Sequence, residues 1–305
     1  MHILVTGASG LLGLNLSLQL TPDHDIVGVG RNKLNRVPFR LLKADLLEPG
    51  ACSRLIDTVR PEAVIHTAAN ALVDACENDP AGAYRLNADL PGELAEICAR
   101  RSIRLLHIST DAVFDGTKEG LYTEEDTPNP LSVYARSKLA GEQNVLSVNP
   151  QAIVARVNFF GWSPSGSRSL VEFFFNNLSA GKSCNGFTDV WFCPMFVGDL
   201  AETLVRMLEN GLSGLYHAVG SESRTKYDFG VQVARQFGFD EGLIIPMSVE
   251  ESGLKAKRSH NLRLSVNKLS THLGRLVPGL STGLPKFYAQ YLQGYPQKIR
   301  SYQQG

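Results

Sequence analysis

The chain has 305 residues, and its 30 basic and 30 acidic side chains cancel to a formal net charge of zero at pH 7. This balance, with no long run of either sign, argues against nucleic acid or a membrane surface as a partner and favours a small-molecule ligand. No apolar run approaches about 18 residues, and the N-terminal stretch is too short for a signal peptide, so we expect a cytoplasmic protein. The five cysteines are scattered along the chain, so we expect reduced thiols and no bound metal.

The first motif is a short apolar run at residues 2–6, followed by a glycine-rich turn and a helical pattern that continues to residue 20. Strand, glycine turn and helix in this order are typical of a dinucleotide-binding unit. The three glycines permit a tight turn, a close approach to the pyrophosphate and packing of the helix on the strand, while the first helical turn offers its N–H groups to the anion. The residues expected to contact the cofactor here are Gly7, Gly10, Leu11, Leu12 and Gly13.

The second predicted strand, residues 25–30, should end beside the adenosine ribose, where an acidic residue would select NAD. Arg31, Asn32 and Lys33 follow it instead, and cations favour the 2′-phosphate of NADP. We therefore expect NADP, with NAD left open and solvated surface charges as the alternative. After a third strand at residues 39–44, Asp45 and Leu46 are placed to meet the adenine, although a capping aspartate explains Asp45 as well.

Three further segments complete the expected cofactor site. A fourth strand begins at Ala63, and its small residues Ala68 and Ala69 would let a cofactor lie close. A long helix over residues 80–101 carries Asn87, whose amide either makes a local hydrogen bond or bridges to a reactive lysine. A fifth strand, residues 104–108, ends in Ser109, Thr110 and Asp111, at the carboxyl edge where ligands of open α/β sheets bind. Thr110 is therefore a catalytic candidate.

Tyr134 and Lys138 are four residues apart in a helix-forming stretch, so their side chains share one face. A neighbouring ammonium stabilises a phenolate, so we expect Lys138 to lower the pKa of Tyr134 from about 10 and make the phenol a general acid. A surface pair is the alternative for this spacing alone. A polar loop at 115–130 is expected to cover the cleft.

The alternation of strands and helices predicts an α/β protein with a doubly wound, parallel Rossmann-type sheet. We expect residues 1–158, with returning segments around 196–220, to form the NADP-binding domain. Residues 159–195 and 221–305 would then form a smaller C-terminal α/β lobe for the substrate. The polar tail after Gly294 is expected to fray.

Three motifs carry a resemblance to a known family: the glycine motif at 6–13, the Ser-Thr-Asp-x-Val-Phe-Asp-Gly segment at 109–116, and the Tyr-x-x-x-Lys pair. With them the chain resembles, over nearly its whole length, an extended short-chain dehydrogenase/reductase of the dTDP-4-dehydrorhamnose reductase branch. Two segments depart from that pattern. The family's Arg-Pro-x-x-Ser-x-Leu is only partly kept at 258–264, and its tryptophan-containing segment differs at 156–161.

The resemblance implies reduction of a nucleotide-diphosphate 4-keto-6-deoxy sugar by NADPH. In that mechanism Tyr134 donates a proton to the ketone, Lys138 holds the nicotinamide ribose, and Thr110 orients the ketone. Ser109 and Asn87 would join the cofactor contacts. The substrate contacts implied are Asp111, Val113, Phe114, Asn158, Phe159 and Arg258.

Arg258 is expected to fork onto the substrate's diphosphate, with a solvated surface charge as the alternative. Two other functions remain open at this stage. One is an epimerase or dehydratase of the same family that retains NAD, against which the missing acid after the second strand argues. The other is a non-catalytic, NADP-binding regulatory subunit resembling the methionine adenosyltransferase beta subunit. Homodimer formation is also left open.

Overall fold

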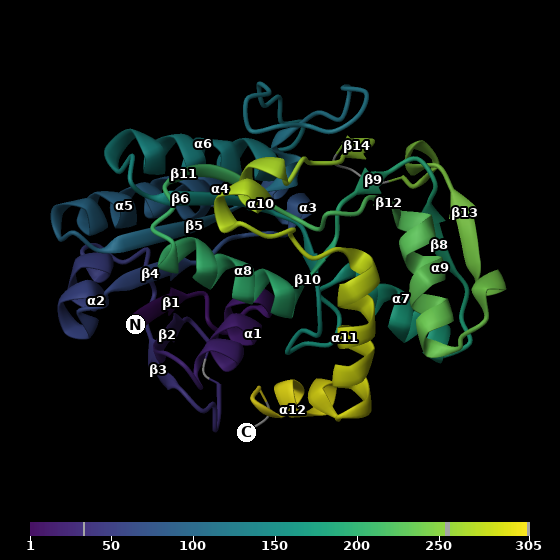
Figure 1. The fold of residues 1–305 in the computed structure, drawn as a ribbon, viewed down its shortest axis with the longest axis horizontal. Coiled ribbons are helices and arrows are strands. Elements are labelled where there is room, and N and C mark those ends of the chain that lie inside the picture. The colour runs from purple at the N-terminus through teal and green to yellow at the C-terminus, as the bar shows by residue number, and fades with distance from the viewer. Residues whose placement is uncertain (33, 254–256, 304–305) are drawn as a thin grey trace.

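The computed structural model describes residues 1–303 except 33 and 254–256. Its centre is a seven-stranded parallel sheet in the order β11-β6-β5-β4-β1-β2-β3 (Figure 1). The strands are β1 (His2–Thr6), β2 (Asp25–Gly30), β3 (Arg40–Lys43), β4 (Ala63–His66), β5 (Arg104–Thr110), β6 (Ile153–Val157) and β11 (Gly214–Ala218). The expected doubly wound α/β sheet is confirmed. The strand order reverses between β1 and β4, which is where ligands bind in sheets of this kind.

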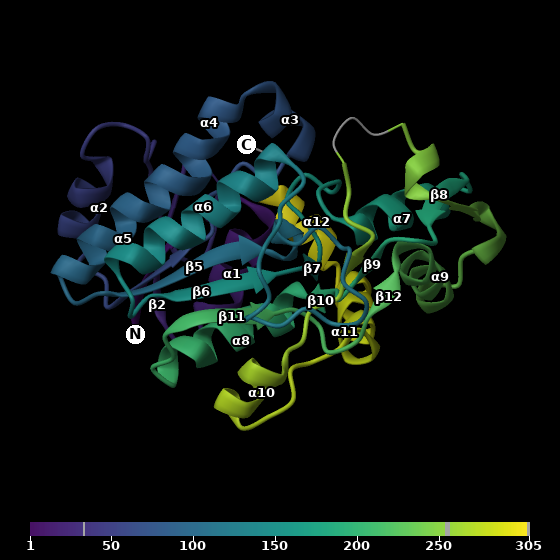
Figure 2. The ribbon, with the colours of Figure 1, turned by 90° about the horizontal axis from the view of Figure 1, so that it is seen from above.

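Helices cover both faces of the sheet (Figures 1 and 2). One face carries α2 (Ala51–Val59), α5 (Leu90–Arg100) and α6 (Val133–Val148), and the other carries α1 (Leu11–Leu20) and α8 (Val197–Glu209). Successive strand residues point to opposite faces, so Ile3 and Val5 join the core beneath α1 while Leu4 joins the core beneath α5. Each strand is therefore apolar on both sides, as a buried parallel strand requires.

Near the carboxyl ends of the strands, the face beneath α6 becomes polar. Glu142 of α6 accepts two hydrogen bonds from Arg156 of β6, over 2.9 Å to Oε1 and 2.7 Å to Oε2. Ser109 donates to the same carboxylate over 2.5 Å. Four further buried residues extend this polar layer across the sheet: Thr6, His66, His107 and His217. The layer fixes α6 over the sheet at the level of the catalytic candidates.

The helix predicted for residues 80–101 is interrupted. It consists of α4 (Pro80–Tyr84), a π-helical turn at Arg85–Asp89 and α5, and it follows the short helix α3 (Val73–Asn78). Pro91 has no N–H to donate to the carbonyl oxygen of Asn87, so the regular pattern cannot continue there. The widened turn brings Asn87 against α6, where a Cβ added to Gly141 would lie 2.2 Å from the Asn87 carbonyl oxygen.

A smaller lobe, at the right in Figure 1, contains α7 (Leu170–Ser179), α9 (Lys226–Phe237), β8 (Cys184–Phe187) and β13 (Ile244–Met247). β8 and β13 pair in parallel, and α7 and α9 pack on each other through the buried rings of Phe174 and Phe229. Short strands link this lobe to the large sheet: β7 (Phe159–Phe160) with β10 (Met195–Phe196), and β9 (Trp191–Phe192) between β12 (Arg224–Thr225) and β14 (Asn261–Leu262).

The C-terminal segment consists of three helices, α10 (Asn267–Leu273), α11 (Leu280–Leu292) and α12 (Tyr295–Ser301). The prediction that the tail after Gly294 frays is wrong, because Ile299 is fully buried and the Tyr295 hydroxyl donates to Asn15 of α1 over 2.9 Å. The N–H of Asn35 also donates to the carbonyl oxygen of Tyr302 over 2.7 Å. These helices thus contact the large domain, and the predicted boundary of the substrate lobe at 221–305 stays a prediction.

None of the described helices combines the length and apolarity needed to cross a bilayer. The five cysteines are all buried, free thiols, as the sequence indicated.

Candidate active site

The phenol of Tyr134 and the hydroxyl of Thr110 meet at the carboxyl end of β5. Ser132 caps α6 by accepting a hydrogen bond from the N–H of Ala135 over 3.2 Å, which places Tyr134 in the first helical turn. The Thr110 side chain lies close enough to the Tyr134 hydroxyl to lower its pKa, and its Oγ1 accepts from the N–H of Ala112 over 3.2 Å. A carbonyl oxygen placed here would meet the Tyr134 phenol as one donor, and the Thr110 hydroxyl could donate to it by turning its single proton away from Asp111.

The electrostatics of this pair differ from the expectation. Burial raises the pKa of Tyr134 to about 12, and the Asp111 charge adds to this, while the hydrogen bond with Thr110 opposes it. The prediction that Lys138 lowers the phenol's pKa is therefore wrong for this structure. Lys138 instead donates to the carbonyl oxygen of Ile108 over 2.6 Å, and burial lowers the pKa of its own ammonium to about 8. Tyr134 keeps its proton at neutral pH, as a general acid must.

Asn87 does not bridge to Lys138. Its fully buried amide donates to the carbonyl oxygen of Asn70 and to the hydroxyl of Ser137, each over 3.0 Å. Its carbonyl oxygen accepts from the N–H of Asn70 over 2.9 Å. Asn87 therefore connects the loop after β4 to the helix of Tyr134, and its contact with a cofactor stays a prediction.

The turn between β1 and α1 has the shape of a phosphate cradle. Gly7 has φ of +69°, and a Cβ there would lie 2.8 Å from the backbone nitrogen of Ala68. A Cβ on Gly13 would lie 2.3 Å from the carbonyl oxygen of Gly7, so a side chain at either position would close the turn. Gly10 provides no side-chain cap for α1. The N–H groups of the first turn, which include Leu11 and Leu12, are thus suited to a pyrophosphate, and the residues fit a dinucleotide.

The predicted adenosine contacts lie around this cradle. Arg31 and Asn32 are exposed after β2, and Lys33 falls outside the described residues. Asp45 accepts a hydrogen bond from the N–H of Leu47 over 3.0 Å, so one carboxylate oxygen serves a local turn. Three other residues were predicted to contact the cofactor here: Leu46 is buried, Ala68 is half-buried and Ala69 is exposed.

Asp111 lies beside the phenol and is almost completely buried. The amide of Asn158 donates to its Oδ2 over 2.5 Å, and the hydroxyl of Thr110 donates to its Oδ1 over 3.1 Å. Burial raises the pKa of Asp111 to about 6, although these hydrogen bonds and the charge of Lys226 act in the opposite direction. Two predicted substrate residues, Asp111 and Asn158, thus lie together next to Thr110.

Val113 and Phe114, also predicted to contact substrate, are fully buried. The ring of Phe114 stacks on Tyr122 at 4.1 Å between centroids, and the guanidinium of Arg156 lies 5.0 Å from it. Both side chains pack in the core, and their contact with a substrate stays a prediction. Phe159 is half-buried in the short strand β7, next to Asn158.

Arg258 approaches the site from the second lobe, and its guanidinium lies 3.8 Å from the carboxylate of Asp74 in α3. Sequence reasoning missed a second cation, Lys226 at the start of α9, which is close enough to both Asp111 and Arg258 to interact with them electrostatically. The only signal in the sequence was a lysine at a helix start, which does not distinguish a site residue from a surface charge.

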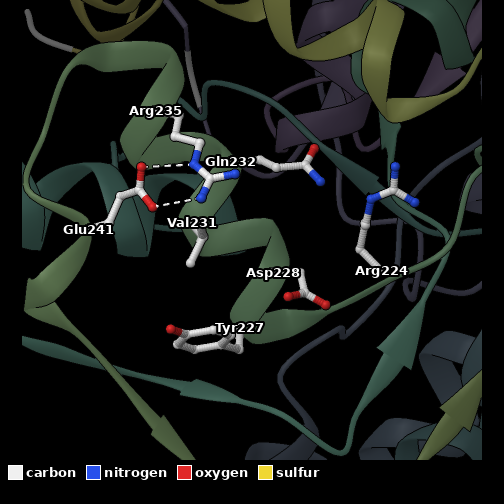
Figure 3. Close-up of a pocket in the computed structure, with 7 residues that line it drawn as sticks. All are labelled: Arg224, Tyr227, Asp228, Val231, Gln232, Arg235 and Glu241. Atoms are coloured by element: carbon white, nitrogen blue, oxygen red, sulfur yellow. Dashed lines mark hydrogen bonds and ion pairs between the residues drawn. The ribbon is translucent and has the colours of Figure 1, made fainter.

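A surface hollow of about 460 Å³ lies elsewhere, along the outer side of α9 (Figure 3). Both of its cations already have acidic partners: Arg235 donates two hydrogen bonds to Glu241, of 2.8 and 2.9 Å, and Arg224 donates to Glu222 over 3.2 Å. The residues that line it include neither Tyr134 nor Thr110, so it is separate from the candidate active site.

The parallel sheet, the glycine cradle at its switch point and the Thr110, Tyr134 and Lys138 group together define a class of protein. They are the features of NAD(P)-dependent oxidoreductases of the short-chain dehydrogenase/reductase type.

The chain belongs to the family described as RmlD substrate binding domain, whose model matches residues 1–293. It is 34% identical to the probable low-salt glycan biosynthesis reductase Agl14 of Haloferax volcanii, over 95% of this chain and 98% of that protein. It is also 34% identical to methionine adenosyltransferase 2 subunit beta of Pongo abelii, over 91% and 84%. Among solved structures, dTDP-4-dehydrorhamnose reductase from Bacillus anthracis in complex with NADP has a TM-score of 0.85 at 26% identity, covering 94% and 98% of the two chains. The expectation of an extended reductase of this family, with NADP as cofactor and NAD compatible, is confirmed.

Proposed function

We propose that this protein reduces the ketone of a nucleotide-diphosphate 4-keto-6-deoxy sugar, in the manner of a dTDP-4-dehydrorhamnose reductase. The observation that carries the proposal is that a Tyr134 phenol, which stays protonated at neutral pH, lies close enough to Thr110 and Asp111 for both to influence its pKa. The NADP-bound reductase with the same fold and the reductase from Haloferax volcanii support it.

The protein's own groups would divide the work as follows. The glycine cradle would hold the pyrophosphate of NADPH, and the reduced nicotinamide of the bound cofactor would supply the hydride for the ketone carbon. Thr110 orients the ketone oxygen, and Tyr134 gives that oxygen a proton as it becomes an alcohol. Lys138 holds the nicotinamide ribose by its ammonium, and Asp111 with Asn158 receives the hydroxyl groups of the sugar. Free, buried cysteines accord with a cytoplasmic setting for this reaction.

A second function is favoured by the 34% identity to methionine adenosyltransferase 2 subunit beta over 91% of the chain. In that case the protein would bind NADP and regulate a methionine adenosyltransferase without turning over a sugar. The retained Thr110, Tyr134 and Lys138 favour the enzyme over this alternative.

A panel of nucleotide-diphosphate 4-keto-6-deoxy sugars, assayed for NADPH oxidation, tests the proposal. We expect turnover of at least one sugar nucleotide, with one alcohol produced for each NADPH consumed. No oxidation with any of them, together with binding of a methionine adenosyltransferase catalytic subunit in calorimetry, would establish the regulatory function instead.

A further inference from the structure

The segment that follows β2, residues 31–38, begins at the edge of the glycine cradle. A Cβ added to Gly30, the last residue of β2, would lie 2.9 Å from the hydroxyl oxygen of Ser9 in the cradle turn. β2 therefore ends directly against the turn that is suited to the pyrophosphate. Arg31 is the next residue and is exposed. A 2′-phosphate on the adenosine ribose of a bound dinucleotide would lie beside this segment.

The backbone of this segment is held by a residue from the other end of the sequence. Among its described residues, which are 31–32 and 34–38, Asn35 is the one whose backbone forms a hydrogen bond outside the sheet. Its N–H donates to the carbonyl oxygen of Tyr302 over 2.7 Å. The neighbouring Leu34 is buried in the same apolar core as Tyr302. The position of the segment thus depends on a contact that is distant in the sequence.

Helix α12, which ends at Tyr302, is itself fixed on α1 (Figure 1). The Tyr295 hydroxyl donates to Oδ1 of Asn15 over 2.9 Å, and the Asn15 amide donates to the carbonyl oxygen of Leu11 over 2.8 Å. Ile299, one helical turn after Tyr295, is fully buried. Because α1 starts at the cradle, α12 connects the cradle to the segment after β2.

A segment that is fixed before the coenzyme arrives binds a phosphate more tightly than a loose one. An exposed arginine loses rotamer freedom when it binds a phosphate, and a loose segment would lose backbone freedom at the same moment. NADH has no 2′-phosphate, so its binding does not use this part of the site. The hydrogen bond between Asn35 and Tyr302 should therefore affect the two coenzymes unequally.

We propose that Tyr302 and α12 select the coenzyme indirectly, by holding the segment after β2 where Arg31 meets the 2′-phosphate of NADP. Arg31 makes the contact, and Tyr302 is a positioning residue that acts through the backbone of Asn35. The proposal requires NADP but no particular sugar, so it is independent of the proposed function.

Titrations of NADPH and NADH against matched variants test this role. Tyr302→Ala removes the buried ring beside the accepting carbonyl, and Tyr302→Phe keeps that ring. Asn35→Pro removes the donating N–H on the other side of the hydrogen bond, and Asn35→Ala keeps it. Gln303→Ala, at an exposed neighbour of Tyr302, is the control for the surface of this segment. Circular dichroism at the titration temperature shows that each variant is folded.

We expect Tyr302→Ala and Asn35→Pro each to weaken NADPH binding by about two- to ten-fold and to leave NADH binding almost unaltered. Tyr302→Phe, Asn35→Ala and Gln303→Ala should bind both coenzymes like the parent. A role in stability alone would lower the affinities for NADPH and NADH by the same factor, and that result would overturn the proposal. Unchanged NADPH affinity in both Tyr302→Ala and Asn35→Pro would overturn it as well.

The double variant Arg31→Ala with Tyr302→Ala tests whether the effect passes through the guanidinium. Once Arg31 is absent, there is no charge left to position, so Tyr302→Ala should cost little further NADPH affinity. The two substitutions should therefore be non-additive, as expected for residues that act on one contact. If Tyr302→Ala weakened NADPH binding equally in the presence and absence of Arg31, Tyr302 would not act through Arg31 and the proposal would fail.

Discussion

The ammonium of Lys138 donates a hydrogen bond to the backbone carbonyl oxygen of Ile108 over 2.6 Å, two residues before Thr110 in the same strand. The bond fixes the ammonium relative to Thr110 without using all of its donors, since an ammonium has three. It also explains why Lys138 has little influence on the phenol one helical turn away. In the proposed mechanism the lysine would hold the nicotinamide ribose, and the tyrosine would give up a proton.

Tyr134→Phe should abolish ketone reduction while leaving NADPH affinity nearly unchanged, because it removes the transferable proton and little else. General acid catalysis typically contributes 10² to 10⁴ in rate, so we expect activity to fall to below about one per cent. Steady-state kinetics and an NADPH titration measure the two effects separately. Lys138→Met is the contrasting variant, since it should weaken NADPH binding as well. Activity of Tyr134→Phe above that level would remove the phenol from the mechanism.

NADPH should bind more tightly than NADH, because a guanidinium rather than a carboxylate follows β2. The exposed side chain of Arg31 has no ion pair among the described residues, which leaves it available to a 2′-phosphate. Arg31→Ala should therefore weaken NADPH binding and leave NADH binding almost unaltered. The affinities for the two coenzymes should then differ less than in the parent protein. Titrating NADPH and NADH against the parent and the Arg31→Ala protein tests this prediction. Equal affinities of the parent for the two coenzymes would refute the assignment of Arg31 to the 2′-phosphate.

Much of the fold could be predicted because the local sequence pattern of most strands and helices indicates their type. The glycine turn fixes β1 and α1, and the apolar runs fix the other strands of the sheet to within a few residues. The interruption of the helix expected at 80–101 was not predicted, although Pro91 lacks the N–H that a continuous helix needs. The buried tail was not readable, because Ile299 and Tyr302 are isolated apolar residues in a polar segment and their partners lie in the first domain.

Some residues of the candidate site could likewise be predicted from the sequence, and others could not. Thr110, Tyr134 and Lys138 stand in motifs whose spacing carries the chemistry, so they could be found from the sequence. Lys226 could not, because only the tertiary fold brings a helix start in the second lobe close enough to Asp111 for the two charges to interact. The pKa of Tyr134 was mispredicted because spacing on a helix reveals neither the burial that raises this pKa nor the acceptor, here the Ile108 carbonyl oxygen, that the Lys138 side chain reaches.

Removing only one partner of the buried ion pair between Glu142 and Arg156 should strongly destabilise the folded protein. Both side chains are almost completely buried, at 4% and 2% exposed. Arg156→Met leaves the carboxylate without its partner, and breaking a buried pair costs about 3 to 5 kcal/mol of unfolding free energy. Replacing both residues, as in Glu142→Leu with Arg156→Met, should recover most of that loss. Urea denaturation measures both variants against the parent, and a loss below about 1 kcal/mol for Arg156→Met would show that the pair is not coupled to folding.

Asp111 should destabilise the folded protein at neutral pH, because its carboxylate is charged there and burial next to the phenol removes that charge from water. Its pKa is raised from 3.8 to about 6 by burial. Between these two pH values the folded protein binds more protons than the unfolded chain, so the free energy of unfolding falls as the pH rises from about 4 to about 6. The penalty is absent below the unfolded pKa and fully present above the folded pKa, where it amounts to roughly 3 kcal/mol.

Asp111→Asn removes this penalty and keeps an oxygen that can accept from the Asn158 amide. We expect it to raise the free energy of unfolding by about 1 to 3 kcal/mol at pH 7, to have little effect near pH 3.5, and to reduce turnover. Asp115→Asn is a control of opposite sign, because hydrogen bonds, first from the N–H of Thr117, lower the pKa of Asp115 to about 2. That variant should lose stability above pH 4, and the loss should disappear as the pH falls towards 2. Urea denaturation across this pH range tests both, and an Asp111→Asn protein that is less stable than the parent at pH 7 would show that the charge of Asp111 supports the fold.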